Sequence, residues 1–341
     1  MNSFARLPIA ERAAVIGDAA TRLGVLPVIV EKDFWVTWML ARVFETPALG
    51  PMVVFKGGTS LSKVFGVIQR FSEDIDLSIS PAALGWTEGD LDNALSVSQR
   101  RKRFEKLEAD CATRVKGAFR EQLETAMREV LGPRHDGNDW LRYELDLVSN
   151  SPVLLFEYPS ALADAAGYIL RSVKVEFGSL TDQRPTGEHN IGPIIAEVLP
   201  SVFDKPLASV VALELERSFW EKATILHAEH HRPPDVPTRR RFARHYSDFA
   251  ALWLHPLGQQ ARKRLDLLER VVLHKSRFFA SKWANYNTAR PSTFRLSPPP
   301  ERVKELAEDY EKMETMFLKP PPAFEQVLKV LGEAEASLNG G

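Results

Sequence analysis

The segment FKGGTSLSKVFGVIQRFSEDIDLSIS, residues 55–80, constrains the fold of this chain more than any other. The apolar run MVVF before two glycines predicts a buried strand that enters a tight turn. LSKVFGVIQRF predicts a short helix, and DIDLSIS alternates apolar and polar residues as a half-buried strand does. Residues 52–80 are therefore expected to form a strand, a glycine turn, a short helix and a second strand.

The turn Gly57-Gly58-Thr59-Ser60 opens the predicted helix and is a candidate phosphate site. Glycine lets the backbone approach a phosphate closely, and the first N–H groups of a helix have no partner within it. The Ser60 hydroxyl could add another donor. The segment is not a P-loop, because no Gly-Lys-Ser/Thr follows the glycines at the required spacing. Alone, such a turn is more often structural.

Asp74 and Asp76 lie two residues apart on the second predicted strand, so their carboxylates project from the same face. Neighbouring carboxylates repel each other unless a cation lies between them. Hard oxygen ligands of this kind suit Mg²⁺ or Mn²⁺. An isolated Asp-x-Asp is also common on solvated strand edges, so the pair gains weight only together with the glycine turn.

A strand, a Gly-Ser turn, a helix and a strand with two aspartates resemble the core of the DNA polymerase β-like nucleotidyltransferases. In that superfamily the turn holds the triphosphate, and the aspartates bind the metals that bridge it. The resemblance implies a third carboxylate on a nearby strand. Glu176 in SVKVEFGS is the favoured candidate, where it shares a polar strand face with Lys174. Asp146 in YELDLVS is the competitor.

Five blocks in order resemble the AbiEii/AbiGii toxin group of nucleotidyltransferases over most of residues 28–255. They are IVEKDFWVTWML, FKGGTSLSKVF with RFSEDIDLSI, SVKVEFGS, ERSFWEKATILHAEHHR and RHYSDFAALW. ERSFWEK has Ser where Thr is more usual. The resemblance implies the toxin of a bacterial type IV toxin–antitoxin or abortive-infection module, with a possible cognate antitoxin. Related members transfer nucleotides onto tRNA ends, and others are described as binding GTP.

The resemblance also implies that Lys222 and Asp248 complete the active site. Their own surroundings suggest less. A lysine beside an apolar helical stripe usually reaches out to solvent, and Asp248 has Arg244 four residues earlier as a surface ion-pair partner. The expected catalytic residues are Asp74, Asp76, Glu176, Lys222 and Asp248. The expected metal ligands, for Mg²⁺ or Mn²⁺, are Asp74, Asp76 and Glu176. The expected nucleotide-binding residues are Lys56, Gly57, Gly58, Thr59, Ser60, Lys63 and Lys222.

The expected fold is α+β, with a polymerase β-like core of mixed sheet and helices and a helical C-terminal half. Strand signals occur in WLRYELDLVS, PVLLFEYP and YILRSVKVEFGS, whereas DQRPTGEHNIGP is turn-rich. Residues 91–131 and 207–231 are expected to be helical. The expected domains are 1–195, the nucleotidyltransferase domain, and 196–341, a mainly helical domain that completes the active site.

Composition bounds the remaining possibilities. The 341 residues are 44% apolar and 26% charged, as in globular proteins, and Cys111 is the only cysteine, which fits a cytoplasmic protein. There is no apolar run of about 18 residues and no signal peptide, so no membrane partner is expected. The net charge is −1, so an RNA or tRNA acceptor would need local basic patches, such as 100–103 or 239–244.

Metal-dependent transfer of a nucleotide from an NTP to an acceptor is the leading hypothesis. A metal-dependent nuclease is the alternative, since Asp-x-Asp with a downstream Lys-Val-Glu could also serve hydrolysis. A nuclease, however, does not need a triphosphate-binding turn. A nucleotide-binding regulatory protein without transfer activity is the third possibility.

Overall fold

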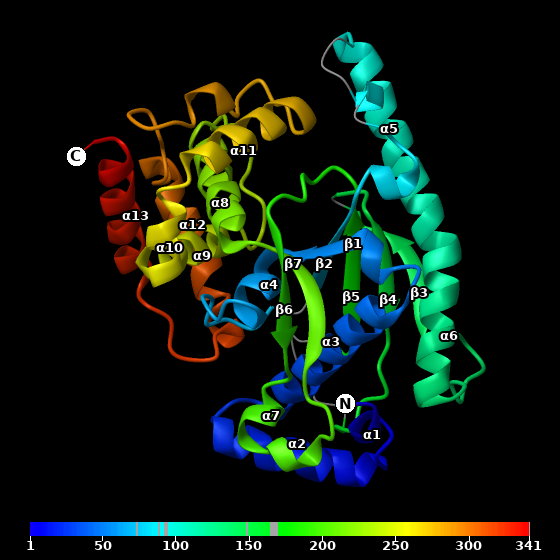
Figure 1. Ribbon diagram of the computed structural model, residues 1–341. Helices are drawn as coiled ribbons and strands as arrows, with labels where there is room; N and C mark the ends of the chain where they lie inside the picture. Colours follow the sequence, from blue (N-terminus) through cyan, green and yellow to red (C-terminus); the bar gives the residue numbers. More distant parts are fainter. Residues whose placement is uncertain (73, 88, 92–94, 148, 164–169, 341) are drawn as a thin grey trace. The chain divides into compact units, whose positions relative to one another are not determined.

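A computed structural model describes residues 1–72, 74–87, 89–91, 95–147, 149–163 and 170–340 (Figure 1). The chain divides into two compact units. The first comprises Met1–Val64 and Glu73–Ala212, and the second comprises Phe65–Ser72 and Leu213–Gly341. Residues 196–212 thus belong to the first unit, although the sequence places them after the predicted domain boundary. Where independently folding domains begin and end stays a prediction.

The first unit is built on a seven-stranded mixed sheet with the strand order β3-β4-β5-β2-β1-β7-β6. Strand β2 is central, because it pairs with β1 antiparallel and with β5 parallel. The predicted α+β class is confirmed. The strands are β1 (Val53–Lys56), β2 (Asp74–Ile79), β3 (Leu141–Leu145), β4 (Pro152–Phe156), β5 (Val173–Gly178), β6 (Thr186–Ile191) and β7 (Ala208–Leu213).

One face of this sheet is apolar and the other carries the charged residues. Ile75 and Leu77 of β2 and Val175 of β5 are fully buried, whereas Asp74 and Glu176 on the opposite face are half-buried. Helices cover the apolar face, where α3, α5 and α6 contact the strands. This alternation is what the sequence predicts for the two strands. The charged face is therefore the candidate reaction surface.

Helix α3 is buried on nearly all sides, including its charged residues Glu31, Lys32 and Asp33. Each of these has a polar partner in the first unit. Glu31, for example, accepts a hydrogen bond from Ser160, and Lys32 donates to the carbonyl of Leu170. The helices of this unit are α1 (Asn2–Ala5), α2 (Ile9–Leu23), α3 (Pro27–Glu45), α4 (Gly57–Lys63), α5 (Val97–Arg114), α6 (Arg120–Leu131) and α7 (Ile195–Val198).

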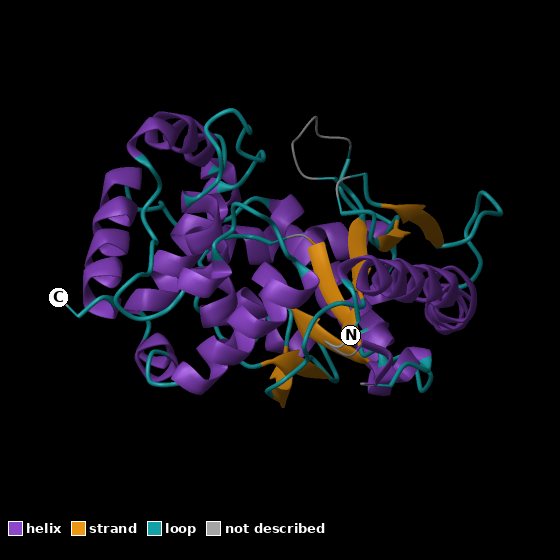
Figure 2. Cartoon of the chain, turned by 90° about the horizontal axis from the view of Figure 1, so that it is seen from above, coloured by secondary structure: helices purple, strands orange, loops and turns teal. Residues whose placement is uncertain are grey.

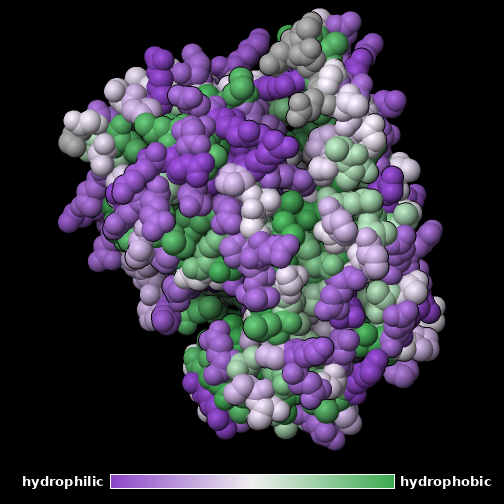
Figure 3. Space-filling view, in the orientation of Figure 1, coloured by the Kyte–Doolittle hydropathy of each residue, from purple (hydrophilic) through white to green (hydrophobic). Residues whose placement is uncertain are grey.

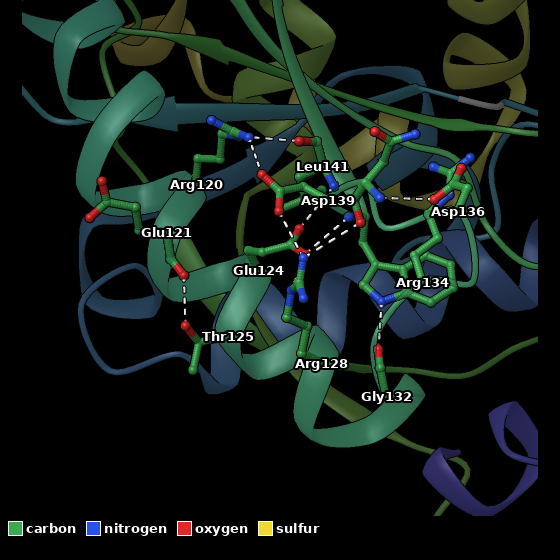
Figure 4. A network of polar contacts seen from close by, with 12 residues as sticks. Arg120, Glu121, Glu124, Thr125, Arg128, Gly132, Arg134, Asp136, Asp139 and Leu141 are labelled. Atoms are coloured by element: carbon green, nitrogen blue, oxygen red, sulfur yellow. Dashed lines mark hydrogen bonds and ion pairs between the residues drawn. The ribbon is translucent and has the colours of Figure 1, made fainter.

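A buried carboxylate on α6 fixes the start of the edge strand β3 (Figure 4). Glu124 accepts hydrogen bonds from the backbone N–H groups of Trp140 and Leu141, each at 3.0 Å, and from Arg128 Nε at 2.7 Å. Arg128 also contacts Asp139 at 2.8 Å. Because these bonds satisfy a buried charge, they hold β3 in register beside β4.

The second unit consists of helices and loops in the part of the chain that the structure describes (Figure 2). Its helices pack pairwise, with α8 against α9, α10 and α11, and α13 against α9. They are α8 (Leu215–His230), α9 (Ala243–Leu254), α10 (Pro256–Ala261), α11 (Leu265–Phe278), α12 (Pro300–Glu311) and α13 (Phe324–Leu338).

Three predicted segments differ from the structure. The helix predicted at 61–71 ends at Lys63, because residues 65–72 leave the helix and pack as part of the second unit. The helix predicted from residue 207 begins only at Leu215, since the β-branched run before it forms β7 and pairs with β1. The turn-rich segment DQRPTGEHNIGP contains strand β6.

Among the described residues, no single helix has the length and apolar character needed to cross a membrane. One bent pair, Ile9–Leu23 with Pro27–Glu45 at 110°, does meet those two criteria. Hydrophilic side chains cover much of the face seen in Figure 3, with hydrophobic ones interspersed among them.

Candidate functional site

The glycine turn and the strand with the two aspartates meet at Gly57. This residue follows the last residue of β1 and has a φ of +82°, in the left-handed region that favours glycine. A Cβ atom at this position would lie 2.0 Å from Oδ2 of Asp76. Only glycine therefore lets the turn pass this close to the Asp76 carboxylate.

Gly57→Ala should displace the Asp76 carboxylate and weaken divalent-metal binding at least tenfold. Gly85→Ala is the matched control, because Gly85 has a φ of +83° but open space around a Cβ. Both variants should lose roughly 1–2 kcal/mol of stability from left-handed strain. Mn²⁺ titration of the two proteins separates this strain from the clash. Equal Mn²⁺ affinities would show that the close approach of Gly57 is unimportant.

The two hydroxyl residues of the turn are buried and bonded within it. Thr59 Oγ1 donates to the carbonyl of Asp74, and Ser60 Oγ donates to the carbonyl of Gly57 at 2.9 Å. Ser60 is 0% exposed. These bonds shape the turn and tie it to β2. A direct hydrogen bond from Ser60 to phosphate stays a prediction, and it would require this hydroxyl to leave its present acceptor.

Lys63, a predicted nucleotide ligand, is paired with other residues of the first unit. Its ammonium lies 2.6 Å from Oδ1 of Asp33, and both side chains are only 8% exposed. It also donates to the carbonyl of Gly192 at 3.3 Å, and Asp33 accepts from the N–H of Ile194. We assign Lys63 a structural role, because it ties α4 to α3 and to the loop before α7.

The charged face brings the predicted acidic residues onto adjacent strands. Asp76 lies opposite Lys56 of β1 on one side and opposite Glu176 of β5 on the other. Asp74 lies opposite Lys174 of β5. Residues directly opposite each other project to the same side of a sheet. Lys56, Asp74, Asp76 and Glu176 therefore share one face, as the alternation in the sequence predicts for Asp74 and Asp76.

The Glu176 carboxylate is engaged by neighbouring side chains. Lys174 Nζ lies 2.9 Å from Glu176 Oε2 and 2.6 Å from Asp146 Oδ2, and Ser149 Oγ lies 2.9 Å from Glu176 Oε1. Burial alone would lower the pKa of Lys174, but the hydrogen bonds to Asp146 and Glu176 raise it above its ordinary value. Both candidates for the third carboxylate thus contact one ammonium.

The donor set suits a hard divalent cation at Asp74 and Asp76. Their oxygens are of the preferred kind, and the missing Cβ of Gly57 leaves space for the Asp76 carboxylate. Within the described part of the chain, no three His, Cys, Asp or Glu side chains converge into a metal-binding group. The role of Glu176 as a third ligand therefore stays a prediction.

Lys222 and Asp248 contact each other in the second unit, and Arg70 joins them. Asp248 is 1% exposed, with Arg70 Nε 2.8 Å from Oδ1, Arg70 Nη2 2.9 Å from Oδ2 and Lys222 Nζ 2.7 Å from Oδ2. Burial alone would raise the pKa of Asp248, but Arg70 and Lys222 hold it well below its ordinary value. The surface interpretations of Lys222 and Asp248 are wrong, since both are buried and paired away from Arg244.

His245 also belongs to this cluster, although the sequence did not single it out. Its Nδ1 lies 3.1 Å from Lys222 Nζ, and burial and the charge of Lys222 lower its pKa well below the ordinary value. A protonated lysine can only donate, so Nδ1 accepts and the ring proton resides on Nε2. The spacing of three residues between His245 and Asp248 in RHYSD was the available signal, because it places both on one helix face.

Residues 65–72 carry Arg70 into the second unit. Arg70 forms an isolated antiparallel bridge with Phe317, flanked by bonds from Phe71 N to Met316 O and from Leu318 N to Gln69 O. In sequence this segment joins helix α4, which carries the glycine turn, to strand β2, which carries the two aspartates. The chain therefore runs from one half of the candidate site, through the Arg70 cluster, to the other half.

Comparison with known proteins identifies the family. The profile of the family described as "Nucleotidyl transferase AbiEii toxin, Type IV TA system" matches residues 38–330. Among solved structures, the chain is similar to MenT4, a nucleotidyltransferase toxin from Mycobacterium tuberculosis. The two share 16% identity and a TM-score of 0.43 over 95% of this chain and 99% of that one. No curated protein matches. The chain belongs to the AbiEii family of nucleotidyltransferase toxins of type IV toxin–antitoxin systems.

Proposed function

We propose that this nucleotidyltransferase uses a divalent metal to move a nucleotide from an NTP onto an RNA acceptor, with tRNA the favoured class. The observation that carries the proposal is the arrangement around Gly57. There, a glycine turn, the Lys56 position and the Asp76 carboxylate lie together on one face of the sheet. This combination suits a metal-bound triphosphate. The toxin would act in the cytoplasm, beside a cognate antitoxin.

Different residues of the first unit would bind the metal ion and the phosphates of the NTP. Asp74 and Asp76 would hold Mg²⁺ or Mn²⁺. Such an ion, when bound, neutralises phosphate charge and lowers the pKa of an acceptor hydroxyl. Lys56 is half-buried and lies opposite Asp76, so its ammonium is suited to neutralise the phosphates. Gly57 and Gly58 allow the backbone to approach them.

The residues of the second unit would supply one further cation. Lys222 has three N–H donors, of which one is directed to Asp248 and another to His245. The third donor is suited to a phosphate oxygen. Both Asp248 oxygens are already bonded, so we propose that Asp248 positions Lys222 and contacts neither nucleotide nor metal. Arg70, four residues before Asp74, tethers this cluster to the metal-binding strand through the chain itself.

The proposal is tested by incubating the protein with bulk RNA and each radiolabelled NTP in turn, followed by sequencing of RNA 3′ ends. Label should enter RNA with Mg²⁺ or Mn²⁺ and should be lost with EDTA. Shortened RNA without incorporated label would instead support a nuclease. Incorporation that survives thorough chelation would contradict the metal requirement.

Lys222→Met should lower nucleotide transfer by about 10²–10³-fold, the usual effect of removing one donor to a developing charge. Lys275→Met is the matched control. Lys275 is equally buried, on α11, but its ammonium donates only to the carbonyl of Glu221 among the described residues, and burial lowers its pKa to about 7. The transfer rate of Lys275→Met should stay within threefold of wild type. Equal rates for the two variants would remove Lys222 from the NTP site.

A further inference from the structure

The charged face of the sheet already contains a cation beside the two aspartates. Lys174 Nζ lies 2.6 Å from Asp146 Oδ2 and 2.9 Å from Glu176 Oε2, and Asp74 is its direct neighbour on β2. The three side chains of the two ion pairs are each 22–25% exposed. Two carboxylates therefore contact one ammonium that is partly shielded from solvent, and Asp74 lies on the neighbouring strand. Ion pairs in such a place are less screened than at an open surface.

The other oxygens of the two paired carboxylates also have partners. Ser149 Oγ lies 3.1 Å from Asp146 Oδ1 and 2.9 Å from Glu176 Oε1, so its single proton is shared between two acceptors. The Ser149 N–H donates to Asp146 Oδ1 at 2.8 Å. Asp146 and Glu176 are thus satisfied by side chains and backbone of this chain, without a metal ion.

We propose that Lys174 is a built-in cation that takes the place of a second metal, so that the nucleotide-free protein binds one divalent ion, at Asp74 and Asp76. The inference rests on the metal dependence proposed above. A second ion at Glu176 would have to break the 2.9 Å ion pair of Glu176 with Lys174 and would lie close to the displaced ammonium. A divalent ion and an ammonium so close together repel each other, because both are positively charged.

This assignment also separates the roles of the acidic residues. Asp74 and Asp76 are the metal ligands, whereas Glu176 and Asp146 hold Lys174 in place beside them. Neither Glu176 nor Asp146 is then a third metal ligand, because both carboxylates bind the ammonium of Lys174. Lys174 contributes positive charge next to the metal, and two of its three N–H donors are held by Asp146 and Glu176.

Mn²⁺ binding to the full-length protein without nucleotide tests the proposal, with stoichiometry read by calorimetry and by the EPR signal of free Mn²⁺. Wild type should bind one ion. Lys174→Gln should bind two, because Asp146 and Glu176 are released as ligands, and Lys174→Arg should bind one because it keeps the charge. Two ions in wild type, or one in Lys174→Gln, would overturn the proposal. No Mn²⁺ in wild type would instead refute the metal dependence on which it rests.

Glu176→Gln provides a measurement that does not depend on the folding of the Lys174 variants. If Glu176 holds Lys174 and not the metal, this variant should still bind one Mn²⁺, with an affinity within about tenfold of wild type. Asp76→Asn should lose the ion. A loss of Mn²⁺ in Glu176→Gln as complete as in Asp76→Asn would show that Glu176 is a metal ligand and that the inference is wrong.

Discussion

Asp248→Ala should lower the free energy of unfolding by about 3–5 kcal/mol, because it leaves two buried cations without their shared partner. Asp248 accepts two hydrogen bonds from Arg70 and one from Lys222, and it is almost fully buried. If Asp248 and Lys222 were ordinary surface charges, the substitution would cause no such loss of stability. Urea unfolding followed by tryptophan fluorescence measures the loss, provided that the transitions of the two units are fitted separately.

Asp266→Ala is the control for this loss of stability. Asp266 forms an ion pair with Arg264 in the same unit, but both side chains are exposed, so the free energy of unfolding should not change measurably. A loss below about 1 kcal/mol in Asp248→Ala would show that the Arg70 cluster does not support the fold.

The pH dependence gives an independent check on Asp248. The pKa of Asp248 is depressed in the folded state, so its charge contributes stability above the pKa that it has in the unfolded chain. That contribution decreases as the pH falls below about 4 toward the lower folded-state pKa. The stability difference between wild type and Asp248→Asn should therefore narrow in acid. A constant difference between pH 7 and pH 3 would contradict the assignment.

The placement of the two aspartates in the candidate site could be predicted from the sequence, because its signals are local. The two glycines mark the turn, and the alternation in DIDLSIS places both aspartates on one face, as the structure has them. The same alternation in SVKVEFGS places Glu176 beside Asp76 once β2 and β5 pair. Side-chain direction in a strand depends only on position, so a period of two is enough.

The Arg70 partner of Asp248 could not be predicted, because it is distant in the chain. Arg70 lies 178 residues away from Asp248, whereas helical spacing points to Arg244. The prediction of a helix over residues 61–71 was wrong for the same reason, because distant contacts decide the structure there. Local propensity favours a helix there, but Arg70, Phe71 and Gln69 bond to residues of the second unit instead. Tertiary contacts override weak local preferences of this kind.

Lys63 shows a different limit of sequence reasoning. A lysine one helical turn after a phosphate turn has the right charge for a nucleotide, but charge says nothing about competing acceptors. Asp33 and the carbonyl of Gly192 hold its ammonium inside the first unit. Lys56 has no ion-pair partner among the described residues, and it lies opposite Asp76. The sequence alone does not distinguish Lys56 from Lys63 as nucleotide ligands. In the structure Lys56 lies opposite Asp76, whereas Lys63 is paired with Asp33.

Asp76→Asn should abolish transfer and remove the stabilisation that Mg²⁺ gives the folded protein. Asparagine keeps the shape that fits against Gly57 but loses the charge that the metal requires. At a Mg²⁺ concentration 100 times the dissociation constant, wild type should gain about 2.7 kcal/mol over the metal-free protein, and the variant should gain almost nothing. Without metal, the melting temperature of the variant should be unchanged or raised, since it relieves the repulsion between neighbouring carboxylates.

Glu144→Gln is the matched control for Asp76→Asn. Glu144 lies opposite Val153, which in turn lies opposite Glu176, so it projects from the same sheet face two strands beyond β5. It should keep both transfer and the Mg²⁺-dependent rise in melting temperature. Full transfer by Asp76→Asn would end the metal hypothesis. A variant that lost transfer but kept the whole Mg²⁺ effect would show that the ion binds elsewhere, and that Asp76 acts on the substrate directly.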